Sequence, residues 1–345
     1  MTPFRALAVG LATLAAATAC SASTSRPART PARPAVRPVA ARTATPPTTN
    51  LVPMRRWRGP VEELFVHPLV LQPRLAFTGD QLGIGFQQYF VTALEFRRLL
   101  DQLWQHGWTL VDVHRAAAGT VRVPAGRRPL VLSEDDVNYY RYFAGRGLTR
   151  RLVLAGGRVL AQLPGGRLTD QDVVPLVEEA VARHPKFAAD GARGVLALTG
   201  YEGLFGEHHL EDAAARRRVR ALGQWLGQHG WTIASHTWGH VDLSSSTPTE
   251  LADDTARWKA LAEPLLGRTD VLVYPFGARP DDAGVRQLVR AGFRIQLDID
   301  VVARRRRLDG AIVMSRRHVD GYSFEVPAQQ AAFYDVARVR DPARP

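Results

Sequence analysis

Cysteine is almost absent from this chain of 345 residues, in which Cys20 is the single occurrence. An intramolecular disulfide is therefore excluded, and so is a metal site built from several thiolates. Lysine occurs only twice, so arginine carries nearly all of the basic charge. No acidic residue precedes Glu62, which places much of the formal net charge of +12 in the N-terminal segment. This distribution argues against nucleic-acid binding, and we interpret the arginine runs at 216–218 and 304–307 as solvated faces.

Residues 1–20 have the pattern of an export signal, because an apolar segment follows Arg5 and residues 17–20 offer a small-residue cleavage site. The apolar segment is too short to span a bilayer permanently. Cys20 directly after the cleavage site resembles a bacterial lipoprotein signal, in which that residue carries the lipid. We therefore expect an exported protein, lipid-anchored at the outer face of the cytoplasmic membrane or secreted. Residues 21–58 are rich in Pro, Thr and Arg without hydrophobic periodicity and are predicted to be a disordered tether.

Short apolar runs alternate with helical patterns through the rest of the chain. Residues 59–128 are predicted to be an N-terminal extension with a first helix-strand unit, irregular over 61–77, and residues 129–340 to be the main domain. The runs of strand length are Thr109–Val113, Leu130–Ser133, Gly194–Leu198, Thr232–Ser235, Val271–Tyr274, Arg294–Leu297 and Ala311–Met314. Such alternation predicts an α/β fold with a parallel sheet. About seven units favour a distorted (β/α) barrel over an open doubly wound sheet, which this pattern leaves open.

Residues 148–163 interrupt the alternation of strands and helices. Two apolar runs flank Gly156-Gly157 there, which predicts an inserted β-hairpin. Because this segment follows the strand that ends in Asp135 and Asp136, we expect the hairpin to overhang the site described next.

Polar side chains gather at the carboxyl ends of the predicted strands, where parallel α/β folds build their active sites. His236 and His240 follow one strand, and Asp135 and Asp136 follow another. Two histidines four positions apart on a helical turn reach the same ion, and one carboxylate would complete the open three-ligand arrangement of a catalytic metal. Each pair is a weak signal alone, because histidine pairs occur by chance and acidic pairs often cap helices. Together they predict a metal site.

The same motifs, in the same order, resemble the polysaccharide deacetylase family, the NodB-type carbohydrate esterases. Residues 133–136, Ser-Glu-Asp-Asp, are similar to its Asp-Asp motif. Residues 236–240 are similar to its His-Ser/Thr-x-x-His element, and residues 274–277 to its Pro-aromatic-Gly element. The resemblance covers about residues 129–320, looks like a bacterial cell-envelope branch, and implies a NodB-like barrel.

The resemblance also implies roles for individual residues. Asp135 would be the catalytic base, and the metal ligands would be Asp136, His236 and His240. Zn²⁺ is the expected ion, and a mixed N/O site also accommodates Co²⁺, Ni²⁺ or Mn²⁺. The expected substrate-binding residues are Tyr201, Trp238, Tyr274, Pro275, Phe276 and Gly277, with the backbone N–H of Tyr274 or of a neighbour holding the oxyanion. Tyr139 and Tyr140 are further aromatics that would either stack on sugars or pack in the rim or core.

Two elements of the family pattern are missing. The arginine that usually precedes the third motif and steadies the base is replaced by Val273; Arg279, Arg316 and Arg317 are the alternatives, and we place Arg317 at the catalytic site. The Leu-x-His element that usually supplies the general acid is not evident, and His318 is the histidine assigned to that role.

The expected function is metal-dependent hydrolysis of N-acetyl groups on an amino-sugar polysaccharide of the cell envelope. The expected partners are this polymer and, through the lipid, the membrane; a monomer without a nucleic-acid partner is predicted. A catalytically silent, glycan-binding module of the same fold is the alternative, which the two missing elements support. A metal-dependent peptidase or phosphatase is disfavoured, because the chain lacks a His-Glu-x-x-His helix and a phosphate-binding glycine loop.

Overall fold

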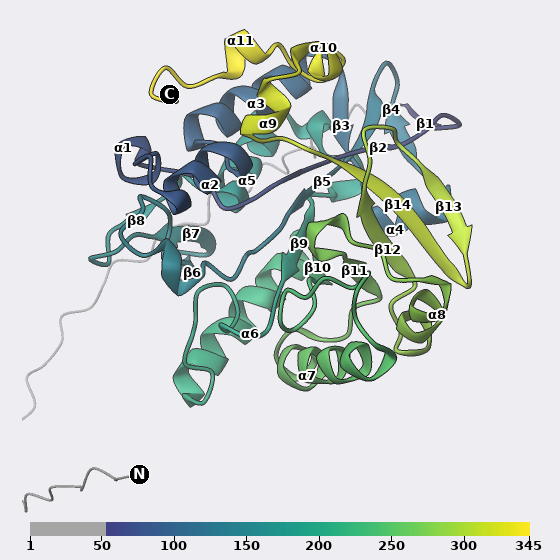
Figure 1. The fold of residues 1–345 in the computed structure, drawn as a ribbon. Coiled ribbons are helices and arrows are strands. Elements are labelled where there is room, and N and C mark those ends of the chain that lie inside the picture. Colours follow the sequence, from purple (N-terminus) through teal and green to yellow (C-terminus); the bar gives the residue numbers. More distant parts are fainter. Residues whose placement is uncertain (1–52) are drawn as a thin grey trace, which may run out of the picture. The chain divides into compact units, whose positions relative to one another are not determined.

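Seven parallel strands close into a barrel in the computed structural model, which describes residues 53–345 (Figure 1). In order around the barrel they are β2 (Glu62–Val66), β5 (Arg128–Glu134), β9 (Val195–Leu198), β10 (Thr232–Ser235), β11 (Val271–Val273), β12 (Ile295–Ile299) and β14 (Ala311–His318). The ring closes because β14 pairs in parallel with both β12 and β2. The predicted (β/α) barrel of about seven strands is confirmed.

One member of the barrel differs from the prediction. β3 (Trp108–Leu110), expected in the ring, pairs with β5 alone among the strands of residues 53–345 and stands beside the barrel. The seventh barrel strand is β2, which lies in the segment predicted to be irregular. Its pattern is hard to recognise in the sequence because Glu63, a charged residue, lies inside the barrel, whereas Leu64 and Val66 pack outward against helices.

Alternation along the strands divides the barrel interior into two levels. Near the amino ends the interior is mainly apolar apart from Glu63, with Val131, Ala234 and Leu297 in one cluster that also includes side chains of α4 (Val113–Ala118). Towards the carboxyl ends the buried interior residues become polar, as with Ser133 of β5 and Arg316 of β14. The barrel is thus a packed core at one end and a polar site at the other.

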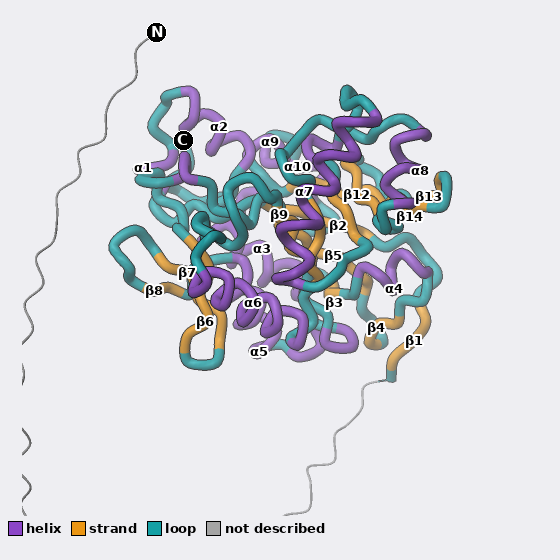
Figure 2. The backbone as a smooth tube through the Cα atoms, turned by 90° about the horizontal axis from the view of Figure 1, so that it is seen from below, coloured by secondary structure: helices purple, strands orange, loops and turns teal. Residues whose placement is uncertain are grey.

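The longer helices cover the outside of the barrel (Figure 2). They are α2 (Gln81–Tyr89), α3 (Ala93–Gln105), α5 (Val173–Arg183), α6 (Ala213–Gln228), α7 (Pro248–Leu266) and α8 (Asp282–Arg290), and the short ones are α1 (Pro73–Ala76), α9 (Gly321–Phe324), α10 (Pro327–Gln330) and α11 (Val336–Val339). α3 begins at the capping box of Thr92 and Glu95 that its sequence suggests. None of the helices among the described residues has the length and apolarity that crossing a membrane requires.

The predicted hairpin is present, but its tip does not overhang the site. β6 (Arg151–Ala155) and β7 (Arg158–Gln162) pair antiparallel, and β8 (Leu168–Thr169) adds a third strand. At the tip, the carbonyl of Gly157 accepts a 2.9 Å hydrogen bond from the indole N–H of Trp225 in α6. Trp225 lies near the end of α6, shortly before β10 begins, and therefore at the amino end of the barrel. Apolar hairpin residues such as Leu152 and Val159 pack into the main core, which holds the hairpin along the outside.

Apart from β3 and the three strands of the hairpin sheet, three further strands lie outside the ring. β1 (Met54–Arg56) pairs with β4 (Arg122–Pro124), so the last residues of the predicted tether form a strand. The predicted signal, residues 1–20 with Cys20, and most of the tether lie outside the described residues. β13 (Arg305–Leu308) pairs antiparallel with β14 and carries most of an arginine run.

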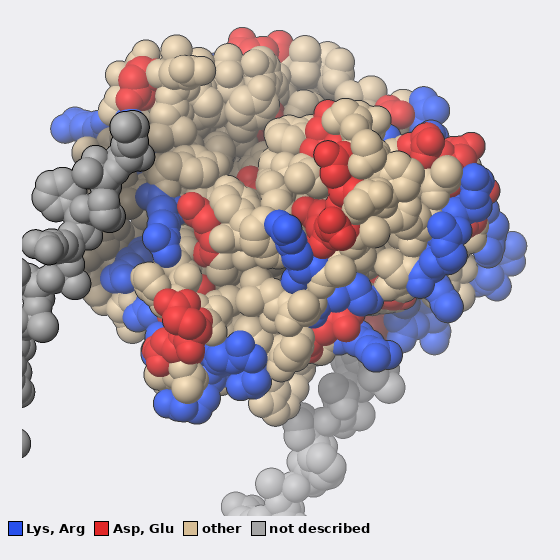
Figure 3. All heavy atoms as spheres, turned by 60° about the horizontal axis from the view of Figure 1, so that its bottom comes forward, with Lys and Arg blue, Asp and Glu red and all other residues tan. Residues whose placement is uncertain are grey.

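The arginine run at 304–307 is partly neutralised by acids. Arg304 contacts Asp300 at 3.0 Å, and Arg306 contacts Asp298 at 2.6 Å. On the face drawn in Figure 3, Lys and Arg side chains are interspersed with Asp and Glu. The charge of this face is therefore mixed, as expected of a solvated surface.

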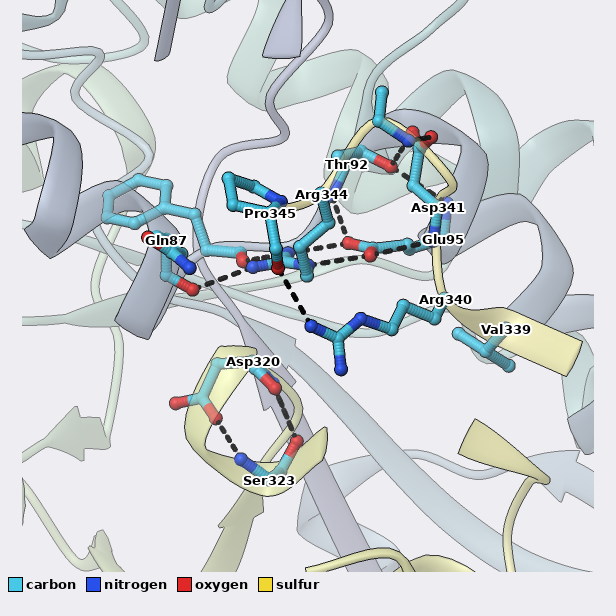
Figure 4. Close-up of polar contacts among 12 residues, drawn as sticks. Gln87, Thr92, Glu95, Asp320, Ser323, Val339, Arg340, Asp341, Arg344 and Pro345 are labelled. Atoms are coloured by element: carbon cyan, nitrogen blue, oxygen red, sulfur yellow. Dashed lines mark hydrogen bonds and ion pairs between the residues drawn. The ribbon is translucent and has the colours of Figure 1, made fainter. Parts of the chain in front are cut away.

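The C-terminal residues fold back over α3 and α2 (Figure 4). Arg344 is buried, and its guanidinium contacts the carboxylate of Glu95 at 2.6 Å and 2.7 Å. The same guanidinium donates to the carbonyls of Gln87 and Phe90 at the end of α2. Arg344 thus joins the C-terminus, the start of α3 and the end of α2.

Candidate metal and active site

Asp136, His236 and His240 come together at the carboxyl end of the barrel. Oδ1 of Asp136 lies 3.8 Å from Nε2 of His236 and 3.6 Å from Nε2 of His240. Each residue offers one ligand atom, and these atoms lie within 4.8 Å of one another. Such separations suit atoms that share one ion at bond lengths of about 2.0–2.2 Å. Within the described part of the chain, this is the one group of at least three His, Cys, Asp or Glu with such geometry.

Asp136 reaches the site because β5 ends just before it. β5 stops at Glu134, and Asp136 has a left-handed φ of 57°. This break lets consecutive acids turn to one site, although they would face opposite sides of a regular strand. The hydroxyl of Tyr140 donates a 2.6 Å hydrogen bond to Oδ1 of Asp136 and lies 3.0 Å from the hydroxyl of Thr199. Burial and then Asp136 raise the pKa of Tyr140 well above its usual value, which keeps it a donor.

The two histidines lie in a loop, so the expectation of a helical turn is wrong. Thr237 and His240 both have left-handed φ values, 62° and 52°, which an α-helix does not tolerate. The loop is held from α7, where the carboxylate of Asp254 accepts the N–H groups of Trp238 at 2.7 Å and of Gly239 at 2.8 Å. A carboxylate from another helix thus brings the imidazoles together, in place of helical periodicity.

His236 has the tautomer and charge that metal ligation requires. Its Nδ1 lies 3.0 Å from the carbonyl of Val273, and since a carbonyl only accepts, Nδ1 carries the proton and Nε2 keeps its lone pair. Burial lowers the pKa of His236 to about 4, so the imidazole stays neutral at physiological pH. The donor set of two imidazoles and one carboxylate therefore fits a divalent transition metal.

Asp135 is held by an arginine that comes from a distant strand. Arg316 of β14 donates to both carboxylate oxygens of Asp135, at 2.6 Å and 3.0 Å, and both residues are buried. Burial alone would raise the pKa of Asp135, but Arg316, followed by His236, reverses the shift and lowers the pKa. Asp135 is therefore ionised at neutral pH, the state that a base requires.

Arg317, which we placed at the catalytic site, points away from it. Its guanidinium donates to the carbonyl of Val301 and lies over the ring of Phe333, 5.3 Å from the centroid. Strand alternation explains the correction, because Met314 and Arg316 face the interior of β14 and Arg317 faces outward. Arg316, one of the three alternatives, is the arginine that contacts Asp135.

His318 and His67 flank Phe65 inside the barrel, near the carboxyl ends of the strands. Nδ1 of His318 contacts Asp320 at 3.1 Å, a hydrogen bond that raises the pKa of His318. Its ring stacks near Phe65, with centroids 6.1 Å apart. His67 follows β2, whose register pairs Val66 with Glu134 and so places His67 level with Asp135.

Sequence reasoning assigned no role to His67. Its Nδ1 lies 2.9 Å from the carbonyl of Tyr89, which accepts a hydrogen bond from Nδ1 and so orients the ring. His67 is among the groups whose charge lowers the pKa of Asp135, after burial has raised it and Arg316 and His236 have lowered it. His67 could have been recognised from the sequence if the apolar run before it had been interpreted as a strand.

Comparison with known protein families gives a match to the part of the chain that contains His236 and His240. Residues 214–295 match the sequence model of the family described as polysaccharide deacetylase. The match covers 82 of the 345 residues and shows that this part of the chain is similar to that family. The matched residues include His236, His240 and the turn at 274–277, whereas Asp135, Asp136 and Arg316 lie outside them. No match was found among curated proteins.

Solved structures of low sequence identity are also similar to this chain. The deacetylase PplD of Streptococcus pyogenes, in complex with acetate, is 15% identical, with 76% of this chain and 93% of that chain covered and a TM-score of 0.48. IcaB from Ammonifex degensii is 16% identical, with 80% and 97% covered and a TM-score of 0.47. A de-N-acetylase from Aggregatibacter actinomycetemcomitans is 15% identical, with 76% and 96% covered and a TM-score of 0.47.

The predicted substrate-binding residues separate into exposed and buried ones. Phe276 is 68% exposed, with a left-handed φ of 59°, and its ring centroid lies 4.6 Å from that of His240. Tyr201 is 41% exposed, and its ring centroid lies 6.3 Å from that of Trp238. The side chains of Phe276, Tyr201 and Trp238 thus lie on the rim around Asp136, His236 and His240, where a sugar ring has access to them. We call these last three residues the ligand group.

The other predicted substrate-binding residues, Tyr274, Pro275 and Gly277, have structural roles. Tyr274 is fully buried, its hydroxyl donates to Gln296, and its backbone N–H already donates to Leu297, so it is not free to hold an oxyanion. Pro275 is buried, and Gly277 has a φ of 68° in the turn that exposes Phe276.

Tyr139 and Tyr140 are not sugar-stacking residues. Both are buried, at 1% and 3% exposure. Tyr140 orients Asp136, and Tyr139 lies in a polar cluster described below.

Proposed function

We propose that this chain is a metal-dependent hydrolase that removes N-acetyl groups from an amino-sugar polysaccharide of the cell envelope. The observation that carries the proposal is the contact between Arg316 and Asp135 directly beside the group of Asp136, His236 and His240. A structural metal site has no use for an additional ionised, buried carboxylate held by arginine. A hydrolytic site requires one, as its general base.

Asp136, His236 and His240 would hold the ion, most simply Zn²⁺, with Co²⁺, Ni²⁺ or Mn²⁺ also suited to the donor set. The bound ion supplies Lewis-acid polarisation of the acetyl carbonyl and a lowered pKa for water. Tyr140 fixes the orientation of Asp136, and the Val273 carbonyl fixes that of His236.

Different protein groups around the metal ligands accept and donate protons in the proposed reaction. Asp135, kept ionised by Arg316, accepts the proton of the attacking water. Within the described residues the backbone N–H of Phe276 has no acceptor, and it is the neighbour of Tyr274 that can stabilise the oxyanion. His67, level with Asp135, is proposed as the proton donor to the leaving amine, in place of His318, which is ion-paired with Asp320.

The contact between Arg316 and Asp135 also argues against the silent binding module. That alternative rested on the absence of an arginine for the base and of a histidine acid. Arg316 provides the first, and His67 offers the second. A binding module would not need a base with a lowered pKa.

Release of acetate tests the proposal. Metal-stripped protein, reloaded with Zn²⁺, Co²⁺, Ni²⁺ or Mn²⁺, is incubated with partly and fully acetylated amino-sugar oligomers, and acetate is measured. We expect metal-dependent release that Asp135→Asn lowers by roughly 10²–10⁴-fold, and a larger loss from His67→Ala than from His318→Ala. Glycan binding without acetate release under every metal would establish the silent module instead.

A further inference from the structure

A second polar cluster is buried on the outer side of β5. It consists of Glu134, Tyr139, Thr149 and Asp172, with exposed fractions of 0%, 1%, 2% and 0%. Glu134 ends β5, Thr149 lies just before the hairpin, and Asp172 is the N-cap of α5. Three separate segments therefore place oxygen atoms in one buried position next to the ligand loop.

Five oxygens of this cluster have no hydrogen-bond partner among residues 53–345. They are both carboxylate oxygens of Glu134, the hydroxyls of Tyr139 and Thr149, and Oδ2 of Asp172. The other oxygen of Asp172 accepts the N–H of Val173 at 2.8 Å. Buried polar groups are almost always paired, and an unpaired buried carboxylate is costly, so these oxygens point to a ligand.

The surroundings of the cluster are negative. Asp172 lies near Glu134, and Asp135 and Asp136 follow Glu134 directly in the chain. Burial raises the pKa of Asp172 to about 6, although the N–H of Val173 and the nearby hydroxyls of Thr149 and Tyr139 act to lower it. None of these neighbours carries a positive charge, so a bound cation would offset the negative charge of both carboxylates.

We propose that Glu134, Tyr139, Thr149 and Asp172 bind a hard divalent cation of the Ca²⁺ type, distinct from the ion held by the histidines. A set of ligands made only of oxygens suits such a cation and lacks the nitrogen and sulfur donors that Zn²⁺ prefers. A pocket of about 360 Å³ lies beside the cluster and is lined by Tyr139 and Thr149, and also by Arg150 and His208.

The bound cation would tie the end of β5 to the base of the hairpin and to α5. Because Glu134 directly precedes Asp135 and Asp136, the tie would stabilise the segment that carries both acids. The inference is independent of the proposed function, since it needs no acetate chemistry.

Calcium binding and thermal stability test this site apart from activity. The background is His240→Ala, which removes a ligand of the first site. Chelator-treated protein is titrated with CaCl₂ by calorimetry, and Tm is measured with CaCl₂ or with NaCl of equal ionic strength. We expect one equivalent of Ca²⁺ to bind and Tm to rise by roughly 5 °C at about 100 times the Kd.

Matched variants locate the bound ion. Glu134→Gln, Asp172→Asn and Tyr139→Phe preserve shape and should abolish or weaken the Ca²⁺-dependent rise. Glu63→Gln is the control, because Glu63 is an equally buried, unpaired carboxyl inside the barrel, and it should leave the rise unchanged. The proposal is overturned if Ca²⁺ does not bind, or if the rise survives in Glu134→Gln and Asp172→Asn. A higher Tm of Glu134→Gln without any Ca²⁺ effect would show instead that the two carboxyls share a proton.

Discussion

Arg316 holds both carboxylate oxygens of Asp135, although the two residues come from strands that are not neighbours. β14 and β5 are separated by β2, and the guanidinium of Arg316 crosses the interior over the ring of Phe65, 4.3 Å from the centroid. The arginine that contacts Asp135 thus comes from later in the chain than residues 274–277. The closed barrel makes this exchange possible, because every strand delivers its carboxyl end to the same rim.

Substitution of Asp135 and substitution of Asp136 should have different effects on metal binding and activity. Asp135→Asn should retain the metal and the fold while kcat falls by roughly 10²–10⁴-fold, as for removal of a general base. Asp136→Ala should lose the metal, as should His236→Ala. Metal content by mass spectrometry is compared with acetate release for each variant. Loss of metal from Asp135→Asn with retention in Asp136→Ala would reverse the two roles.

Removing the charge of Arg316 should move the acid limb of the pH profile. In the native protein Arg316 lowers the pKa of Asp135 against the effect of burial. In Arg316→Gln burial is less opposed, so the pKa rises and the base protonates at a higher pH. The loss of kcat/KM should therefore be greater at pH 5 than at pH 8.

Arg316→Lys is the matched control for this prediction. It keeps the positive charge but loses the two-pronged contact, so the rate should fall with a smaller displacement of the acid limb. Folding of each variant is checked by circular dichroism. Acid limbs at the same pH in the native protein and in Arg316→Gln would show that Arg316 does not set the charge of Asp135.

Deleting the hairpin tip should affect stability more than polymer binding. Gly157 at the tip bonds to Trp225 on α6, at the end of the barrel opposite the candidate site. Shortening residues 155–158 should lower Tm and leave the KM for the polymer unchanged. Trp225→Phe, which removes the same hydrogen bond, serves as a comparison and should lower Tm less. A raised polymer KM with unchanged Tm would return the hairpin to the substrate surface.

The buried pair of Arg344 and Glu95 should contribute strongly to stability. Arg344→Met leaves Glu95 buried without its cation, a change that typically lowers the free energy of unfolding by about 3–5 kcal/mol. Arg340→Met is the control, because its contact with Glu325 is largely exposed and such pairs contribute about 0–1 kcal/mol. Urea unfolding measures both. Equal effects of the two substitutions would contradict a special role for the buried pair.

Lipid attachment should depend on the single cysteine. The proposal rests on the pattern of residues 17–20, which lies outside the described residues. Cells that express the full chain are labelled with a clickable fatty acid, and we expect labelling of the native protein but not of Cys20→Ser. Equal labelling of both proteins would exclude Cys20 as the lipid acceptor.

The sequence by itself determined the class of fold and the identity of the ligand group. Strand periodicity is local, so runs such as Thr232–Ser235 were recognisable. The expected number of seven held only because β2, which was missed, takes the place of β3 in the ring. The ligand group followed from strand ends, because parallel strands deliver their carboxyl ends to one rim whatever lies between them. Asp136, His236 and His240 meet there, as the sequence led us to expect.

Only the tertiary structure decided which residues support that group. Arg316 was one of three arginines in the sequence, and its contact with Asp135 depends on which face of β14 points inward and on closure of the barrel around β2. β2 itself was missed because a buried glutamate interrupts its apolar pattern. The hairpin formed as its turn residues dictate, but the indole of Trp225, 68 positions away, fixed where its tip lies. Pairings over such distances depend on packing, which local sequence patterns do not encode.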